Sequence, residues 1–228
     1  MVAYLPAPEL CQGADEDIIS QIAGIIFPDF IERNQAVNGL RLKLDGDYRD
    51  KSLIKIATDQ FQILLGILRA WNPLAGQRVD EVRPGIGAGS IHDEHGNQLV
   101  RVGSAIEYVK RSEVEAYGRD AKVALDRSLH IRNAAWLHGR RDRNAADFYM
   151  IYEYAAKDFG NDKAVAASLG LSRKDIKRLT NSANHLAPMD GGRHAREMHI
   201  VEWDLERQKV FIANFLKSWI EFRARMAS

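Results

Sequence analysis

Hydrophobic residues in the second half of the chain recur every three or four positions, which is the period of an amphipathic helix. The clearest segment ends at Gly160, a residue typical of a helix C-cap. Gly170 separates two shorter segments of the same kind. The pattern predicts helices over residues 106–137 (as one helix or two), 144–159, 162–169, 173–184 and 201–226.

The first half of the chain mixes this period with the two-residue alternation of a half-buried strand. Leu40, Leu42 and Leu44 alternate with charged residues, and the glycines and prolines of residues 72–89 indicate a loop. The pattern predicts strands over residues 40–44, 53–57, 90–92 and 99–102, and helices over 15–30 and 58–71. We therefore expect an α+β protein.

The change in pattern also predicts where the chain divides. Residues 1–103 are expected to form a small mixed α+β region, and residues 104–228 a mainly helical bundle. The boundary is placed at Gly103–Ser104, between the last predicted strand and the first long helix.

The composition is that of an ordinary globular protein, since 46% of the 228 residues are hydrophobic and 28% are charged. The net charge is only +1, so a nucleic-acid partner would have to bind to a local basic patch.

The single cysteine, Cys11, cannot form a disulfide within the chain. No apolar run reaches the ~20 residues that span a bilayer, and the N-terminus lacks a signal-peptide pattern. We expect a cytoplasmic protein with no membrane partner.

One local patch is strongly basic. It combines five arginines within seventeen residues with two aspartates at the margins, and it is typical of a phosphate-binding surface or of a solvated loop. The arginines are Arg127, Arg132, Arg140, Arg141 and Arg143.

The same patch contains an arginine followed by a polar residue, Arg132-Asn133, and then His138 with five residues between the arginine and the histidine. This segment resembles the active-site motif of HEPN domains, a family whose name abbreviates higher eukaryotes and prokaryotes nucleotide-binding. The resemblance covers roughly residues 104–226.

The resemblance implies a metal-independent ribonuclease, in which the RNA 2′-hydroxyl attacks the adjacent phosphate. Arg132 would hold the phosphate, His138 would transfer a proton, and Asn133 would orient one of them. It further implies RNA as partner, a homodimer with two facing motifs, no cofactor or metal, and a role in bacterial stress response or phage defence.

Helix geometry sets a condition on that mechanism. Arg132 and His138 lie about 120° apart around a straight helix, so they do not share a face. The helix must break near Trp136 to Gly139, or a second subunit must complete the site. Alternatively, His138-Gly139 is only a helix C-terminus, with a cationic His near the dipole and a left-handed Gly, and Arg132 only an ion-pair residue.

A second interpretation comes from residues 162–185, where Ala166, Gly170 and Ile176 have the spacing of a DNA-binding helix-turn-helix. Ser172 would cap the second helix. That helix would present a basic face to DNA: Arg173, Lys174, Lys177 and Arg178. A loop rather than a third helix follows, and a plain corner between two packed helices fits the same residues.

A third basic segment follows Gly191 and Gly192. It could contribute further basic side chains to the Arg132 site, or it could be an ordinary loop between helices. Its residues are Arg193, His194 and Arg196. The functional predictions are therefore a HEPN-like RNA-cleaving or RNA-binding protein, a non-enzymatic DNA-binding regulator, or a helical protein-interaction scaffold.

Overall fold

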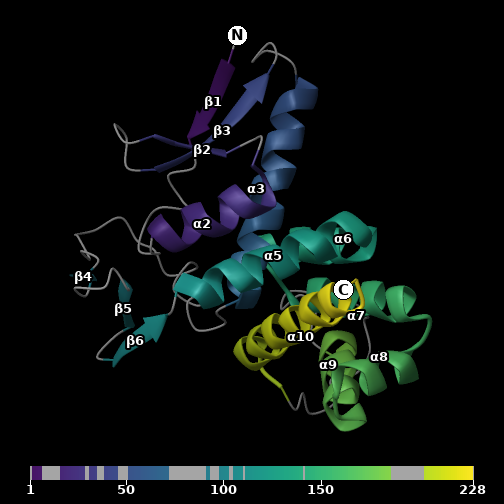
Figure 1. Cartoon of the computed structure of the whole chain (residues 1–228). Helices are drawn as coiled ribbons and strands as arrows, with labels where there is room; N and C mark the ends of the chain where they lie inside the picture. The colour runs from purple at the N-terminus through teal and green to yellow at the C-terminus, as the bar shows by residue number, and fades with distance from the viewer. Residues whose placement is uncertain are drawn as a thin grey trace. The chain divides into compact units, whose positions relative to one another are not determined.

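The computed structural model of the chain (Figure 1) describes most of the helical segments and six short strands. The residues described are 2–6, 16–28, 31–34, 39–45, 51–71, 91–92, 98–102, 105–109, 111–140, 142–185 and 203–227. These residues belong to two compact units that interleave along the chain. The first comprises residues 1–61 and 74–122, and the second comprises residues 62–73 and 123–228. The predicted boundary at Gly103–Ser104 stays a prediction.

The first unit contains two antiparallel three-stranded sheets, with strand orders β1-β3-β2 and β4-β5-β6. The strands are β1 (Val2–Pro6), β2 (Ile31–Asn34), β3 (Gly39–Asp45), β4 (Ile91–His92), β5 (Gln98–Val102) and β6 (Ala105–Val109). Helix α2 (Glu16–Ile26) buries Ile22, Ala23 and Ile26. Helices α3 (Lys51–Trp71) and α5 (Arg111–Arg127) each begin in this unit and end in the second.

The α+β prediction is wrong for the part of the chain whose side chains the structure describes. There, 87% of the residues are helical and none lies in a strand. Apart from Trp203, which directly precedes the last helix, every buried hydrophobic residue described lies in a helix. The described core is therefore that of a helical bundle, which agrees with the prediction for the C-terminal half.

Part of the error lies in residues 53–57, which were expected to form a strand and instead belong to α3. A short apolar run fits the period of a strand and that of a helix equally well. Here the run continues into a long helical pattern, and Lys55 forms an i,i+4 ion pair with Asp59 at 2.6 Å, so the helix extends back to Lys51.

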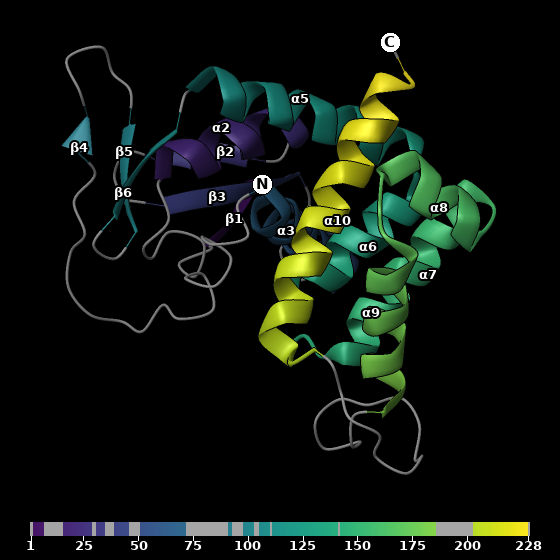
Figure 2. The ribbon, with the colours of Figure 1, turned by 90° about the horizontal axis from the view of Figure 1, so that it is seen from below.

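The second unit is a helical bundle around α7 (Figure 2), which contacts α6, α8, α9 and α10. Trp219, Phe148 and Phe215 are its largest fully buried side chains. The helices completing this unit are α6 (Leu129–Gly139), α7 (Ala145–Phe159), α8 (Asp162–Leu169), α9 (Arg173–His185) and α10 (Leu205–Arg225).

The ends of these helices follow from local sequence signals. Asn144 accepts hydrogen bonds from the amides of Ala146 and Asp147, and the Asp147 carboxylate accepts one from the Asn144 amide, forming a capping box. Gly160 ends α7 with φ of 92°, which confirms the predicted C-cap. Gly170 ends α8 in the same left-handed region, with φ of 62°.

Helices α3 and α6 cross within the second unit at two glycines. A Cβ atom on Gly66 would overlap the carbonyl of Ala135, and one on Gly139 would overlap the carbonyl of Gln62. Backbone carbonyls cannot move aside as a flexible side chain can, so this crossing distance requires glycine at both positions.

We predict that Gly66→Ala lowers the free energy of unfolding by about 2–3 kcal/mol, because the helices must separate to admit the methyl group. The matched control is Gly24→Ala in α2, where no atom lies within 4 Å of the added carbon. At that exposed position alanine should raise the free energy of unfolding by up to about 1 kcal/mol. Urea unfolding followed by circular dichroism measures both, and equal stability of Gly66→Ala and wild type would contradict the close crossing.

Candidate nucleic-acid-binding surface

The segment that resembles the HEPN motif lies in α6, which runs without a break from Leu129 through His138 to Gly139. Arg132 and His138 therefore lie about 120° apart around one straight helix. The helix break that would bring them together within one chain is not present. Any joint site would need a second subunit.

His138 is buried, with only 2% of its surface exposed. Neither ring nitrogen has a hydrogen-bond partner among the described residues. Burial lowers the pKa of His138 well below 6.5, and the positive charges of Arg143 and Arg69 lower it further. The ring is thus neutral at pH 7 and has no access to a substrate in this conformation.

The C-terminus of α6 is instead closed by arginines from outside the helix. The Arg69 guanidinium, from α3, donates to the carbonyls of His138, Gly139 and Arg140, at 3.1 Å for His138 and 2.9 Å for Arg140. Arg143 donates to the His138 carbonyl as well, at 2.7 Å. These bonds satisfy carbonyls that have no partner within the helix.

This arrangement corrects the helix-cap alternative in two respects. The cations at the helix end are Arg69 and Arg143 rather than His138, whose ring is neutral. The described glycines with positive φ are Gly160 and Gly170, so Gly139 serves close packing rather than a left-handed turn.

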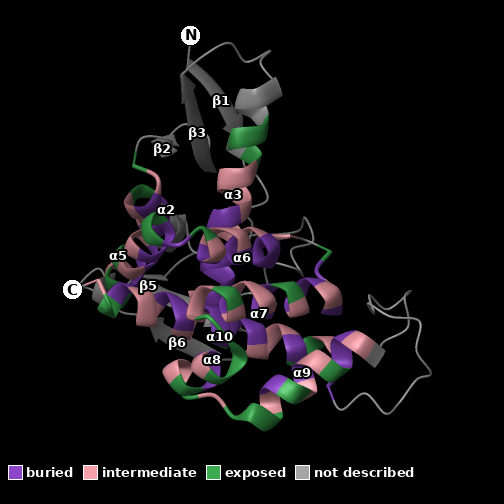
Figure 3. Cartoon of the chain, turned by 90° about the vertical axis from the view of Figure 1, so that its right-hand side faces the viewer, coloured by how far each residue is buried: buried purple, intermediate pink, exposed green. Residues whose placement is uncertain are grey.

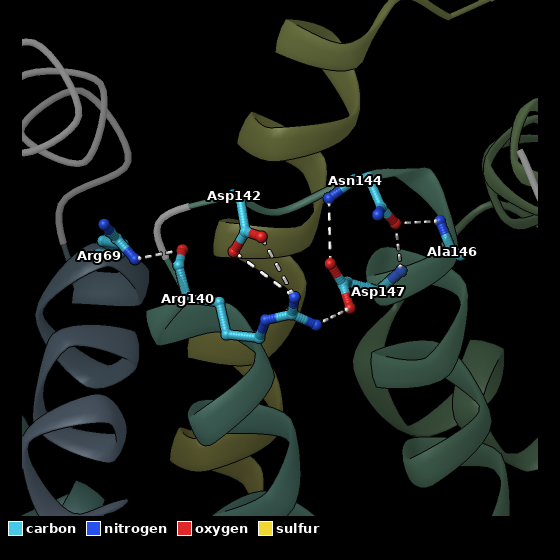
Figure 4. Close-up of polar contacts among 6 residues, drawn as sticks. All are labelled: Arg69, Arg140, Asp142, Asn144, Ala146 and Asp147. Atoms are coloured by element: carbon cyan, nitrogen blue, oxygen red, sulfur yellow. Dashed lines mark hydrogen bonds and ion pairs between the residues drawn. The ribbon is translucent and has the colours of Figure 1, made fainter. Parts of the chain in front are cut away.

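Two arginines of the predicted basic patch, Arg140 and Arg143, are engaged within the protein; Figure 4 shows the contacts of Arg140. Arg140 forms ion pairs with Asp147 at 2.9 Å and with Asp142 at 3.4 Å, and Arg143 is buried. Burial raises the pKa of Asp147, while the Asn144 amide and the Arg140 charge oppose that shift.

The remaining predicted site residues differ in how exposed they are. Arg127 is exposed, whereas Arg132 and Asn133 are half-buried, and Arg132 donates to the Leu125 carbonyl at 3.4 Å. Four further predicted residues lie outside the described residues: Arg141, Arg193, His194 and Arg196.

We predict that His138 makes the protein less stable as the pH falls below 6.5. The unfolded chain binds a proton at this histidine that the folded chain does not, so stability falls by up to about 1.4 kcal/mol per pH unit. His138→Leu removes this loss. The free energy of unfolding of the variant should therefore rise relative to that of the wild type as the pH falls from 6.5. Urea unfolding at several pH values measures this difference. A difference that is independent of pH would show that His138 is not held neutral.

The predicted helix-turn-helix has the expected local structure. Helix α8 ends at Gly170, the Leu171 amide donates to the Ala166 carbonyl at 2.9 Å, and α9 begins at Arg173. Ala166 and Ile176, the predicted packing positions of the motif, are buried, each with 8% of its surface exposed. The Ser172 hydroxyl accepts from the Lys174 amide at 3.1 Å, which confirms the predicted cap.

A third helix lies beside the predicted motif, and it precedes α8 rather than following α9. Helix α7 precedes the motif and packs against both α8 and α9. Each of the three helices contributes a fully buried side chain to the second unit: Phe148 from α7, Val165 from α8 and Leu179 from α9. The signal was available, because the sequence predicts a helix over residues 144–159 directly before the motif.

Figure 3 shows exposed positions along α9, and most of these positions are basic. Arg173, Lys174 and Lys177 are exposed, as predicted, and Asn181 is exposed one turn after Lys177. Arg178 differs from the prediction, since it is half-buried and paired with Asp175 at 3.2 Å. We call Arg173, Lys174, Lys177 and Asn181 the α9 face. Sequence reasoning missed Asn181, whose i,i+4 spacing from Lys177 was the available signal.

Among the described residues, no three His, Cys, Asp or Glu side chains are grouped as a metal site would require. None of the helices described has both the length and the apolar character needed to cross a membrane. No protein-family model, curated protein or solved structure matches the chain.

Proposed function

We propose that the chain is a non-enzymatic DNA-binding protein that places α9 in the major groove of a duplex. The observation that carries the proposal is the α9 face, three cations and an asparagine exposed on the second helix of a helix-turn-helix. In this motif the second helix contacts base edges and phosphates, while the preceding helices hold it in place.

The dimensions of α9 suit this role. Its 13 residues make a helix about 20 Å long, and the major groove of B-DNA admits an α-helix. Arg173, Lys174 and Lys177 would contact phosphates or guanine, and the Asn181 amide is suited to bidentate contact with adenine.

The ribonuclease interpretation stays a prediction and has less geometric support. For His138 to act on RNA, its ring would have to leave the core, which would disturb the Arg69 and Arg143 bonds to the end of α6. Binding through α9 requires no such rearrangement, because Arg173, Lys174 and Lys177 are already exposed.

We predict that the triple variant Arg173→Gln, Lys174→Gln, Lys177→Gln loses most of its affinity for a duplex. The slope of log affinity against log salt should fall in magnitude by about 3, since each phosphate contact contributes about 0.9. Fluorescence anisotropy with a labelled duplex over a series of salt concentrations measures this slope.

The matched control removes three positive charges from α10, with Lys209→Gln, Lys217→Gln and Arg225→Gln. It should keep the wild-type slope, because these charges lie outside the α9 face. If the two triple variants lost the same slope, the binding would be non-specific attraction to net charge, and the proposal would be overturned. Absence of duplex binding by the wild type would overturn it too.

A further inference from the structure

A pocket of about 840 Å³ opens between α7, the start of α8 and α9. Its volume falls within the range of small-molecule binding sites. The helices that form it belong to the same compact unit, and α7 packs against both α8 and α9. The pocket reaches the α9 face, because Arg173 and Lys177 belong to both.

The pocket collects positive charge from three helices. Lys157 comes from α7, Lys163 from α8, and Arg173 and Lys177 from α9. Glu153 and Asp162 are the two carboxylates in the lining, so basic groups outnumber acidic groups by four to two. Cations contributed to one pocket by separate helices suit a compact ligand with several negative charges, such as a phosphate chain.

The same pocket contains aromatic and apolar surface. Tyr149 and Tyr152 line it from α7, and Ile176 lines it from α9. Tyr152 is buried and Tyr149 is half-buried, so Tyr149 has the more accessible ring. Burial raises the pKa of the Tyr152 hydroxyl, and the neighbouring Asp162 carboxylate raises it further through a hydrogen bond and through its charge. An aromatic ring beside several cations is the combination that a nucleotide base and its phosphates require.

We propose that this pocket binds a nucleoside phosphate, with the base against Tyr149 and the phosphates between Lys157, Lys163 and Arg173. A bound nucleotide would occupy Arg173 and Lys177, which the α9 face needs for DNA. Nucleotide and duplex therefore compete, and the nucleotide acts as a negative effector of DNA binding. The pocket stands independently, whereas the competition rests on the proposed DNA binding.

Isothermal titration of the full chain with ADP tests the pocket without DNA. We expect saturable binding that weakens about tenfold or more in Lys157→Gln, Lys163→Gln. Lys174→Gln is the matched control, because Lys174 lies on the α9 face but does not line the pocket, and it should bind ADP as the wild type does. No saturable binding at about 1 mM ADP, or equal binding by both variants, would overturn the pocket.

Inorganic pyrophosphate separates the two parts of the ligand. It should bind the wild type more weakly than ADP does. Tyr149→Ala should lower the affinity for ADP to that of the wild type for pyrophosphate. Pyrophosphate that binds the wild type as tightly as ADP would overturn the assignment of the base to Tyr149.

The competition is tested by duplex binding with and without saturating ADP. We expect ADP to weaken duplex binding about fivefold or more in the wild type. Lys157→Gln, Lys163→Gln should bind duplex normally and show no effect of ADP, which also controls for added salt. Duplex affinity unaffected by ADP in a protein that binds both would overturn the competition. Binding of ADP without any duplex binding would leave the pocket intact and overturn the proposed DNA function.

Discussion

The crossing of α3 and α6 determines how the rest of the second unit is built. Gly66 and Gly139 bring the two backbones so close that no side chain fits between them. That approach places the Arg69 guanidinium at the end of α6, where it binds three consecutive carbonyls. A buried cation at a helix C-terminus is favoured by the unpaired carbonyls and by the helix dipole. Steric fit and charge therefore stabilise the same contact.

The contact also decides which part of the chain is accessible for function. His138 is buried at this end of α6, and burial together with the charges of Arg143 and Arg69 lowers its pKa and keeps its ring neutral, while Arg140 and Arg143 form contacts next to that helix end. The residues that most resemble an active site are thus part of the packing of the bundle. Helix α9, by contrast, carries exposed basic side chains and packs against α7.

How much the sequence could predict depends on the range of the interactions involved. The bounds of α7, α8 and α9 follow from neighbouring residues, such as the Asn144 cap and the left-handed Gly160 and Gly170, and they were predicted to within a residue or two. The strand expected over residues 53–57 failed because a short apolar run fits both periods. The carbonyls of His138 and Gly139 are bound by Arg69, which lies 69 residues before His138, so no local pattern announced this contact. Gly139 likewise looked like a cap, although its partner is the distant backbone of Gln62.

Amide hydrogen exchange of the full chain, with and without a DNA duplex, tests most directly whether α6 is structural and α9 functional. We expect strong protection of the α6 amides in both states, because the crossing with α3 shields that helix from solvent. Added duplex should increase protection in α9 and at the start of α8 while leaving α6 unchanged. Rapid exchange in α6, or duplex-induced changes confined to residues 129–139, would contradict the account.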